Sequence, residues 1–80
     1  MGAHLHSYSQ FDALTAEELT GLLRRSRLSK TDRQIAAQYL IWRMPMIDIA
    51  VSHGYSRTAV SWRFRHVIVP ELEHLMRAAA

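Results

Sequence analysis

Apolar residues recur three and four positions apart through much of this chain, a spacing that places them on one face of a helix. The first such stripe holds Leu19, Leu22 and Leu23. Thr15 stands three residues before Glu18, which is a capping-box pattern. These residues predict a helix that begins at Ala16 and runs to about residue 25 or 26.

A second apolar stretch follows a second helix start. Ser29 is a suitable N-cap, and Asp32 in the first turn complements the positive end of the helix dipole. The apolar positions beyond them are Ile35, Ala36, Tyr39, Leu40 and Trp42. We expect this helix to run to about Arg43 and to form the centre of the core.

Two shorter helices are predicted next, joined by a tight turn. Pro45 is favoured in a first helical turn, so a third helix is expected over about residues 45–53. Gly54 can end it in a left-handed conformation, and Ser56 can cap a fourth helix over about residues 57–69. A three-residue turn with glycine between two short helices is the pattern of a helix-turn-helix motif. Its expected core residues are Ile49, Ala50, Gly54, Tyr55, Val60 and Phe64.

The start of the chain lacks this pattern. Residues 1–12 show no helical period, and we expect a flexible arm there, ahead of a helix-turn-helix domain at 13–80. His4 and His6 lie in this arm. They have no carboxylate or third ligand in register, so they predict no metal site.

The end of the chain predicts one more helix. Pro70 is expected in its first turn, because proline is tolerated there. Its apolar face would hold Leu72, Leu75 and Met76. The predicted fold is therefore all-α, a compact bundle of about five short helices that contains a helix-turn-helix.

Composition and the lack of a recognisable sorting signal favour an intracellular domain. The chain has 80 residues and no cysteine, so disulfides and thiolate metal sites are excluded, which suits a reducing cytoplasm. No run reaches the roughly 18 apolar residues of a membrane span, and MGAHLHSYSQ lacks the apolar core of a signal peptide. We expect one soluble, cytoplasmic domain of marginal stability.

Positive charge is concentrated in the middle of the chain. The net charge is only +3, yet nine lysines and arginines against two aspartates lie between Arg24 and Arg65. Such a distribution favours nucleic-acid binding, because neutralising phosphates releases counterions. A solvated basic surface is the alternative interpretation.

The predicted fourth helix has one polar, basic face. Hydroxyl groups can bind phosphates and arginine can bond guanine through two hydrogen bonds, so this face holds the groups that reading a major groove requires. The candidate DNA-binding residues are Ser56, Arg57, Thr58, Ser61, Trp62 and Arg65. Trp62 is expected either to contact thymine methyls and sugars or to pack on the first helices or a second subunit.

Acidic residues and histidines show no pattern for catalysis. The seven carboxylates have no metal-ligand spacing, and the sequence has no glycine-rich phosphate loop and no Ser, His and Asp set on neighbouring turns. His53 and His66 are expected to be partly exposed structural histidines. We therefore expect no enzyme activity, no metal and no cofactor.

Several of these residues together resemble the KorA/TrfB family of small plasmid-encoded transcriptional repressors. The segments that carry the resemblance are LTAEELTGLL, IAAQYL and SRTAVSWRFRHV, with Pro45, Ala50 and Gly54 between them. The match is best at GYSRTAVS, and a weaker similarity runs to PapB-type regulators of fimbrial operons. The resemblance implies a dimeric repressor whose fourth helix reads an operator. KorA-like repressors commonly carry a further dimerisation region, whereas VPELEHLMRAAA follows Ile68 here, so the dimer interface cannot be taken from the family.

The function predicted from the sequence is sequence-specific repression of transcription. One small module reads few base pairs, so we expect a homodimer, formed through the N-terminal or C-terminal helices, on a palindromic double-stranded DNA operator. The alternative is a protein-interaction module that docks on RNA polymerase or another regulator, with Trp62 as its aromatic anchor.

Overall fold

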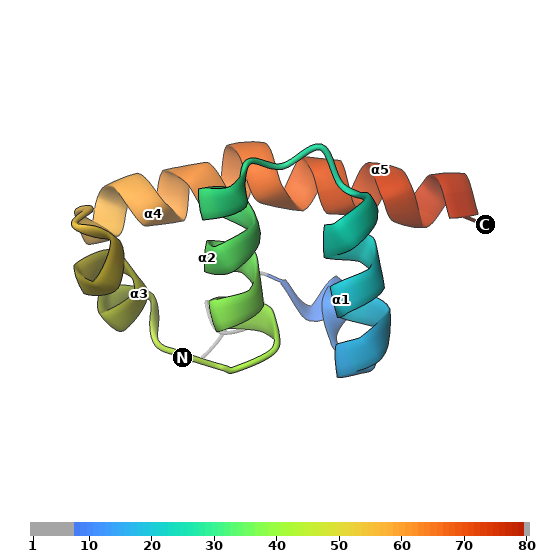
Figure 1. The fold of residues 1–80 in the computed structure, drawn as a ribbon, viewed down its shortest axis with the longest axis horizontal. Helices are drawn as coiled ribbons and strands as arrows, with labels where there is room; N and C mark the ends of the chain where they lie inside the picture. Colours follow the sequence, from blue (N-terminus) through green and yellow to red (C-terminus); the bar gives the residue numbers. More distant parts are fainter. Residues whose placement is uncertain (1–7, 80) are drawn as a thin grey trace.

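The computed structural model describes residues 8–79 of the chain, and every regular element in that range is helical (Figure 1). A 3₁₀ turn at Ser9–Phe11 comes first. It is followed by α1 (Ala16–Arg25), α2 (Lys30–Leu40), α3 (Met46–His53), α4 (Arg57–Arg63) and α5 (Val69–Ala79). The all-α prediction is confirmed. His4 and His6 lie outside the described residues.

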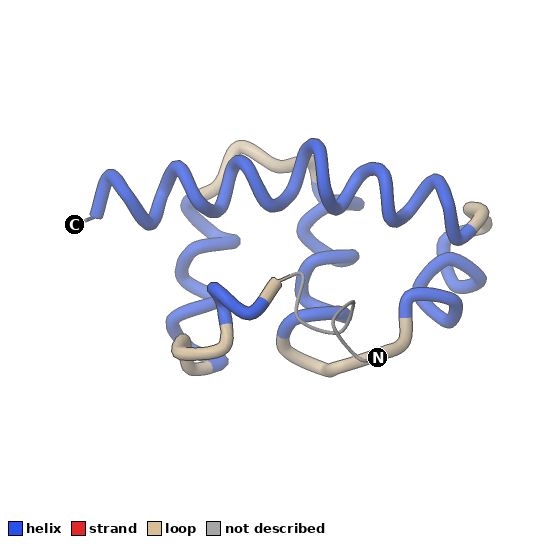
Figure 2. The backbone as a smooth tube through the Cα atoms, turned by 180° about the vertical axis from the view of Figure 1, so that it is seen from behind, coloured by secondary structure: helices blue, strands red, loops and turns tan. Residues whose placement is uncertain are grey.

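Residues 57–79 form one continuous helix, which we call the rod. α4 passes into α5 through a π turn at Phe64–Ile68, with no loop between them (Figures 1 and 2). The described chain therefore holds four separate helices rather than about five. The predicted break near Pro70 is wrong. In the described range, the rod and the other helices all lack the apolar length needed to cross a membrane.

Pro70 explains why the rod contains a π turn. Proline has no N–H to donate to the carbonyl four residues back, and its ring crowds that carbonyl. Directly before it, the Val69 N–H donates to the carbonyl of Phe64, five residues back, which widens the turn. The rod thus accommodates a proline that the sequence pattern alone marks as a helix start.

The rod also presents the central stripe of the core. Four of its residues, spaced four apart, have no exposed surface: Val60, Phe64, Ile68 and Leu72. In a regular α-helix each step of four overshoots a full turn by about 40°, so this stripe would drift around the helix. The wider π turn takes up an extra residue and keeps the four side chains facing the other helices.

The remaining elements pack against this stripe. α1 and α2 lie side by side and antiparallel beneath the rod, and α3 lies under its first turns (Figures 1 and 2). Phe64 contacts the rings of Tyr8 and Tyr39 at centroid distances of 4.7 and 5.0 Å. Phe11 in the 3₁₀ turn is buried as well. The last residues of the predicted arm therefore pack on the domain, which the absence of a helical period did not indicate.

Local capping signals set the helix starts as predicted. Thr15 and Glu18 form the reciprocal capping box at the start of α1. The Ser29 hydroxyl accepts a hydrogen bond from the Asp32 N–H, and the Ser56 hydroxyl accepts one from the Ala59 N–H. Each bond satisfies a backbone donor that the first helical turn leaves without a partner.

Two aromatic residues expected in the core are exposed instead. Trp42 has 66% of its surface exposed, because α2 ends at Leu40 and the chain has already turned away from the core. Tyr55 is 41% exposed. It follows Gly54, whose left-handed backbone (φ 72°) directs the chain outward, and its ring stacks beside His53 at 6.1 Å.

The two glycines of the described chain predict stability effects of opposite sign. Gly54→Ala places a Cβ in a left-handed residue and is expected to cost about 1 kcal/mol, although no atom lies within 4 Å of that Cβ. Gly21→Ala lies within α1, where the new Cβ meets only the flexible end of Arg25 at 3.4 Å, and is expected to stabilise by about 0.5–1 kcal/mol. Urea unfolding of both variants checks this. Equal effects at the two positions would contradict it.

Candidate nucleic-acid interface

α3 and α4 form a compact pair, joined by the three-residue turn 54–56. Gly54 and Tyr55 donate their N–H groups back to the carbonyls of Val51 and Ala50, at 3.2 and 2.9 Å. This double bond pattern with a left-handed glycine is the Schellman ending of a helix. Of the other residues expected in this pair's core, Ile49, Ala50, Val60 and Phe64 are buried. The pair therefore holds α4 firmly by one face.

The opposite face of α4, which Arg65 in the π turn continues, is open to solvent. Of the six residues predicted to bind DNA, five are exposed: Ser56, Arg57, Thr58, Trp62 and Arg65. Ser61 is half-buried. Helical periodicity brings Thr58, Trp62 and Arg65 onto one side, because they are separated by four and three residues. The structure thus gathers hydroxyl, guanidinium and indole groups on one helix surface.

Trp62 stands at the centre of this surface. The residue is 56% exposed, and its ring lies against that of His66 in a tilted arrangement, with 4.8 Å between centroids and 36° between planes. Within the described chain it does not pack on the first helices, whereas its predicted contacts with DNA or with a second subunit stay predictions. The exposed part of the indole leaves an apolar surface available to a ligand.

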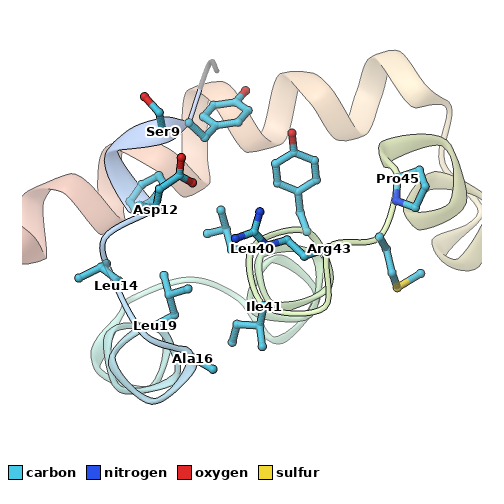
Figure 3. A pocket seen from close by; sticks show the side chains of 13 residues that line it. Ser9, Asp12, Leu14, Ala16, Leu19, Leu40, Ile41, Arg43 and Pro45 are labelled. Carbon is cyan, nitrogen blue, oxygen red and sulfur yellow. The ribbon is translucent and has the colours of Figure 1, made fainter. Parts of the chain in front are cut away.

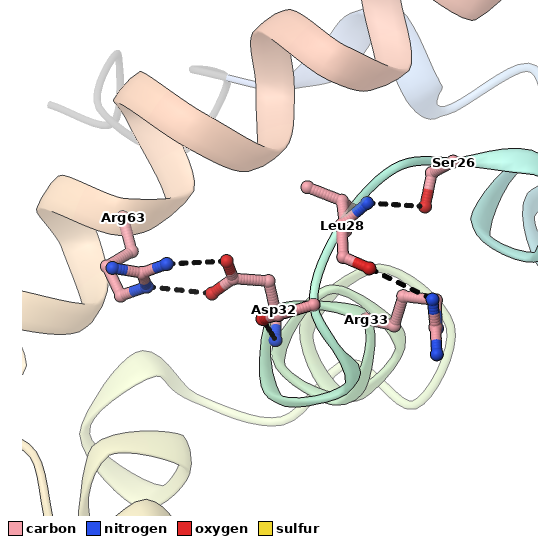
Figure 4. A network of polar contacts seen from close by, with 6 residues as sticks. Ser26, Leu28, Asp32, Arg33 and Arg63 are labelled. Atoms are coloured by element: carbon pink, nitrogen blue, oxygen red, sulfur yellow. Dashed lines mark hydrogen bonds and ion pairs between the residues drawn. The ribbon is translucent and has the colours of Figure 1, made fainter.

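Arg63 turns the other way, into the protein. Its Nε and Nη2 donate to the two carboxylate oxygens of Asp32 at 2.7 and 2.6 Å (Figure 4). The Asp32 side chain is almost completely buried and that of Arg63 is 38% exposed. This two-point ion pair ties α4 to the first turn of α2. It also fixes the rotation of α4, so that Arg65 faces outward.

The ion pair changes the titration of both groups. Hydrogen bonding to Arg63 is the main reason that the pKa of Asp32 lies below its ordinary value. Burial of the carboxylate opposes this effect. The positive charge of Arg63 and a hydrogen bond with Ser29 lower the pKa further. The same hydrogen bond raises the pKa of Arg63. Asp32 is therefore ionised in the folded protein at neutral pH.

Sequence reasoning missed this pair. It assigned Asp32 to the helix dipole and counted Arg63 among the free basic charges. The available signal was position, since Arg63 directly precedes Phe64 and lies three residues after Val60, on the flank of the buried stripe. Nothing local identified its partner, because Asp32 lies 31 residues earlier.

The basic residues of the middle of the chain do not form one surface. Lys30 begins α2, whereas Arg43 follows its end, so α2 separates them. The Arg33 guanidinium donates to the Leu28 carbonyl at 2.9 Å, and Arg63 is paired with Asp32. Positive charge on the candidate interface therefore comes mainly from Arg57 and Arg65.

Two histidines were expected to be structural and partly exposed. His53 is half-buried, and its Nε2 lies 2.9 Å from the side-chain oxygen of Gln38, which links α3 to α2. His66 is exposed and stacks on Trp62. In residues 8–79 no three histidines or carboxylates gather closely enough to hold a metal ion.

Comparisons of the chain with protein-family models, with curated proteins and with solved structures find no match in any of the three. The resemblance to KorA/TrfB repressors therefore stays a prediction from the quoted residues. The case for function depends on the exposed face of α4 and on the packing that orients it.

Removal of Arg63 is expected to destabilise the fold strongly. Arg63→Ala leaves the Asp32 carboxylate buried without a partner and should cost on the order of 3 kcal/mol in unfolding free energy. Arg65→Ala is the matched control, since Arg65 is exposed, and should change stability by less than about 0.5 kcal/mol. A double variant, Asp32→Leu with Arg63→Met, should recover most of the loss. Equal stability of the two single arginine variants in urea unfolding would contradict the assignment.

The same pair predicts a loss of stability in acid. Because the pKa of Asp32 in the folded protein lies below its ordinary value of 3.8, the ionised carboxylate stabilises the fold above that value, and this stabilisation is lost as the pH falls through the folded pKa. The difference in unfolding free energy between the natural protein and Asp32→Asn should therefore shrink as the pH falls from neutral to below 3.8. A difference that stays constant over this range would show that the carboxylate does not act through its charge.

Proposed function

We propose that this protein is a sequence-specific DNA-binding transcriptional repressor of the helix-turn-helix class. In this proposal α3, the turn 54–56 and α4 are the helix-turn-helix motif, and α4 with the first π residues is the recognition helix. The observation that carries the proposal is the two-sided character of α4. One side carries the buried Val60, followed by the buried Phe64, while the other presents Arg57, Thr58, Trp62 and, in the π turn, Arg65 to solvent.

The chemistry of the exposed side suits a major groove. An α-helix fits this groove, and residues near its N-terminal end reach the base edges. Arg57 and Arg65 can each donate two hydrogen bonds to a guanine, and the methyl group of Thr58 can contact a thymine methyl. The Ser56 hydroxyl and the free N–H groups of the first turn suit a phosphate.

Trp62 adds an apolar contact to this polar surface. Contact with the ring of His66 restricts the indole before DNA is bound, so less side-chain freedom is lost on binding. Thymine methyl groups and deoxyribose rings are the apolar features that a major-groove helix meets. We infer that Trp62 favours operators with thymine opposite the middle of α4.

We further propose that the protein binds a palindromic operator as a homodimer. A single helix of this length contacts few base pairs, and a two-fold dimer doubles the contacts on half-sites about 34 Å apart. Bound over a promoter, such a dimer would repress by excluding RNA polymerase. α1 and the free end of the rod are the surfaces that this proposal assigns to the dimer contact.

A second candidate function is docking on RNA polymerase or another regulator. The observation in its favour is the exposure of Ile47 and Val51, one helical turn apart on α3, with Val51 74% exposed. Together with Trp62 these side chains offer apolar anchors of the kind found at protein interfaces. In that case Trp62→Ala would abolish binding to the partner protein, and no duplex would be bound selectively.

The decisive experiment is selection of tight binders from random duplex DNA, followed by titration of the best site and a scrambled duplex at two salt concentrations. We expect an inverted repeat, bound about a thousandfold more tightly than the scrambled duplex. The spacing between the two halves of the repeat gives the distance between the two recognition helices of the dimer. Uniform binding that only weakens with salt would reject the proposal and direct the test to RNA polymerase.

Two arginine variants test the interface residue by residue. Arg57→Ala and Arg65→Ala should each weaken specific binding by about 1–3 kcal/mol while the fold stays intact. Arg24→Ala is the matched control, because Arg24 is exposed at the end of α1, away from α4. Fluorescence anisotropy on the selected duplex measures the change. Equal losses for all three variants would show general charge attraction instead of readout.

A further inference from the structure

A cavity of about 420 Å³ lies on another part of the molecule, between the 3₁₀ turn, the start of α1 and the loop that joins α2 to α3 (Figure 3). This volume is within the range of small-molecule sites. Its apolar lining includes Phe11, Leu14, Leu19, Leu40, Ile41 and Met44. The proposed DNA-binding function uses none of them.

Two opposite charges line the same cavity. Asp12 comes from the chain just after the 3₁₀ turn and Arg43 from the α2–α3 loop, and Figure 3 shows both side chains directed toward the space between them. Both residues are exposed. Within residues 8–79 neither side chain forms an ion pair or a hydrogen bond, in contrast to Asp32 and Arg63. A carboxylate and a guanidinium thus line the same cavity as several apolar side chains, and neither is paired within residues 8–79.

The backbone at Arg43 is unusual in a way that supports a ligand site. Its φ is 58°, the one positive value among the non-glycine residues of the described chain. This left-handed conformation is unfavourable for a residue with a Cβ, and such residues gather at ligand-binding sites. The Met44 N–H donates to the Gln38 carbonyl at 2.9 Å and holds the loop in this form. A glycine would adopt the same backbone without strain, so we infer that the arginine side chain at this position has a function.

We propose that this cavity binds a small zwitterion with an apolar body, namely an α-amino acid with a large apolar side chain. The Arg43 guanidinium would bind its carboxylate through two parallel hydrogen bonds, and the Asp12 carboxylate would accept hydrogen bonds from its ammonium group. The Asp12 carboxylate would repel a ligand that carries only a negative charge, and the Arg43 guanidinium would repel one that carries only a positive charge. Only a ligand that carries both charges satisfies both walls, while its side chain covers the apolar lining.

The test uses the full 80-residue chain and L-phenylalanine, L-leucine and L-methionine as probes, titrated to about 10 mM by calorimetry and by amide NMR. We expect saturable binding of at least one, with shift changes at Leu14, Tyr39 and Met44. The charge requirement is checked on L-phenylalaninamide and N-acetyl-L-phenylalanine, which lack the carboxylate and the ammonium group. Each should bind at least tenfold more weakly than L-phenylalanine.

Arg43→Gly separates recognition from folding. Glycine removes the guanidinium but adopts the left-handed backbone freely, so the variant should melt at the same or a higher temperature and lose ligand binding. Asp12→Asn should weaken binding at least tenfold, and Arg24→Ala should leave it unchanged. The proposal would be overturned if none of the three amino acids bound saturably. It would also be overturned if the two analogues bound as tightly as L-phenylalanine, or if Arg43→Gly bound the amino acid as tightly as the natural protein. No arm of this experiment involves DNA, so its failure leaves the proposed function untouched.

Discussion

The buried stripe of the rod is the constraint on which the rest of the structure depends. Val60, Phe64, Ile68 and Leu72 are completely buried, and each of the other helices packs against some part of the rod. A spacing of four residues is slightly too long for one face of a straight α-helix. The π turn reconciles the spacing with a single buried face. In doing so it makes one helix both the centre of the core and the carrier of the exposed α4 surface.

The Asp32–Arg63 pair adds orientation to this packing. Apolar contacts are non-directional, so the stripe alone allows α4 to rotate somewhat about its axis. Two hydrogen bonds to one buried carboxylate fix both the rotation and the distance to α2. The pair therefore decides that Arg63 points inward while Arg65, two residues later, points to solvent. A proposed recognition surface of this kind needs such a fixed orientation, because base contacts tolerate little displacement.

α3 is bracketed by two left-handed residues, and they differ in kind. Gly54 follows α3 and suits its conformation, since glycine has no Cβ to oppose a positive φ. Arg43 precedes α3 and holds the same backbone region against that preference. The first residue ends α3 and starts the turn to α4. Arg43 lines the cavity and lies in the loop that leads into α3. The two proposed sites therefore lie at opposite ends of this short helix.

The sequence by itself determined the helix starts, the left-handed turn at Gly54 and the polar face of α4, because caps, glycine conformation and helical periodicity act over a few neighbouring residues. The tertiary structure decided what depends on distant partners. It paired Arg63 with Asp32, placed Tyr8 and Phe11 on the core and left Trp42 exposed. It also carried the rod through Pro70, because the buried stripe on both sides of the proline favours one continuous helix over the local break that proline predicts.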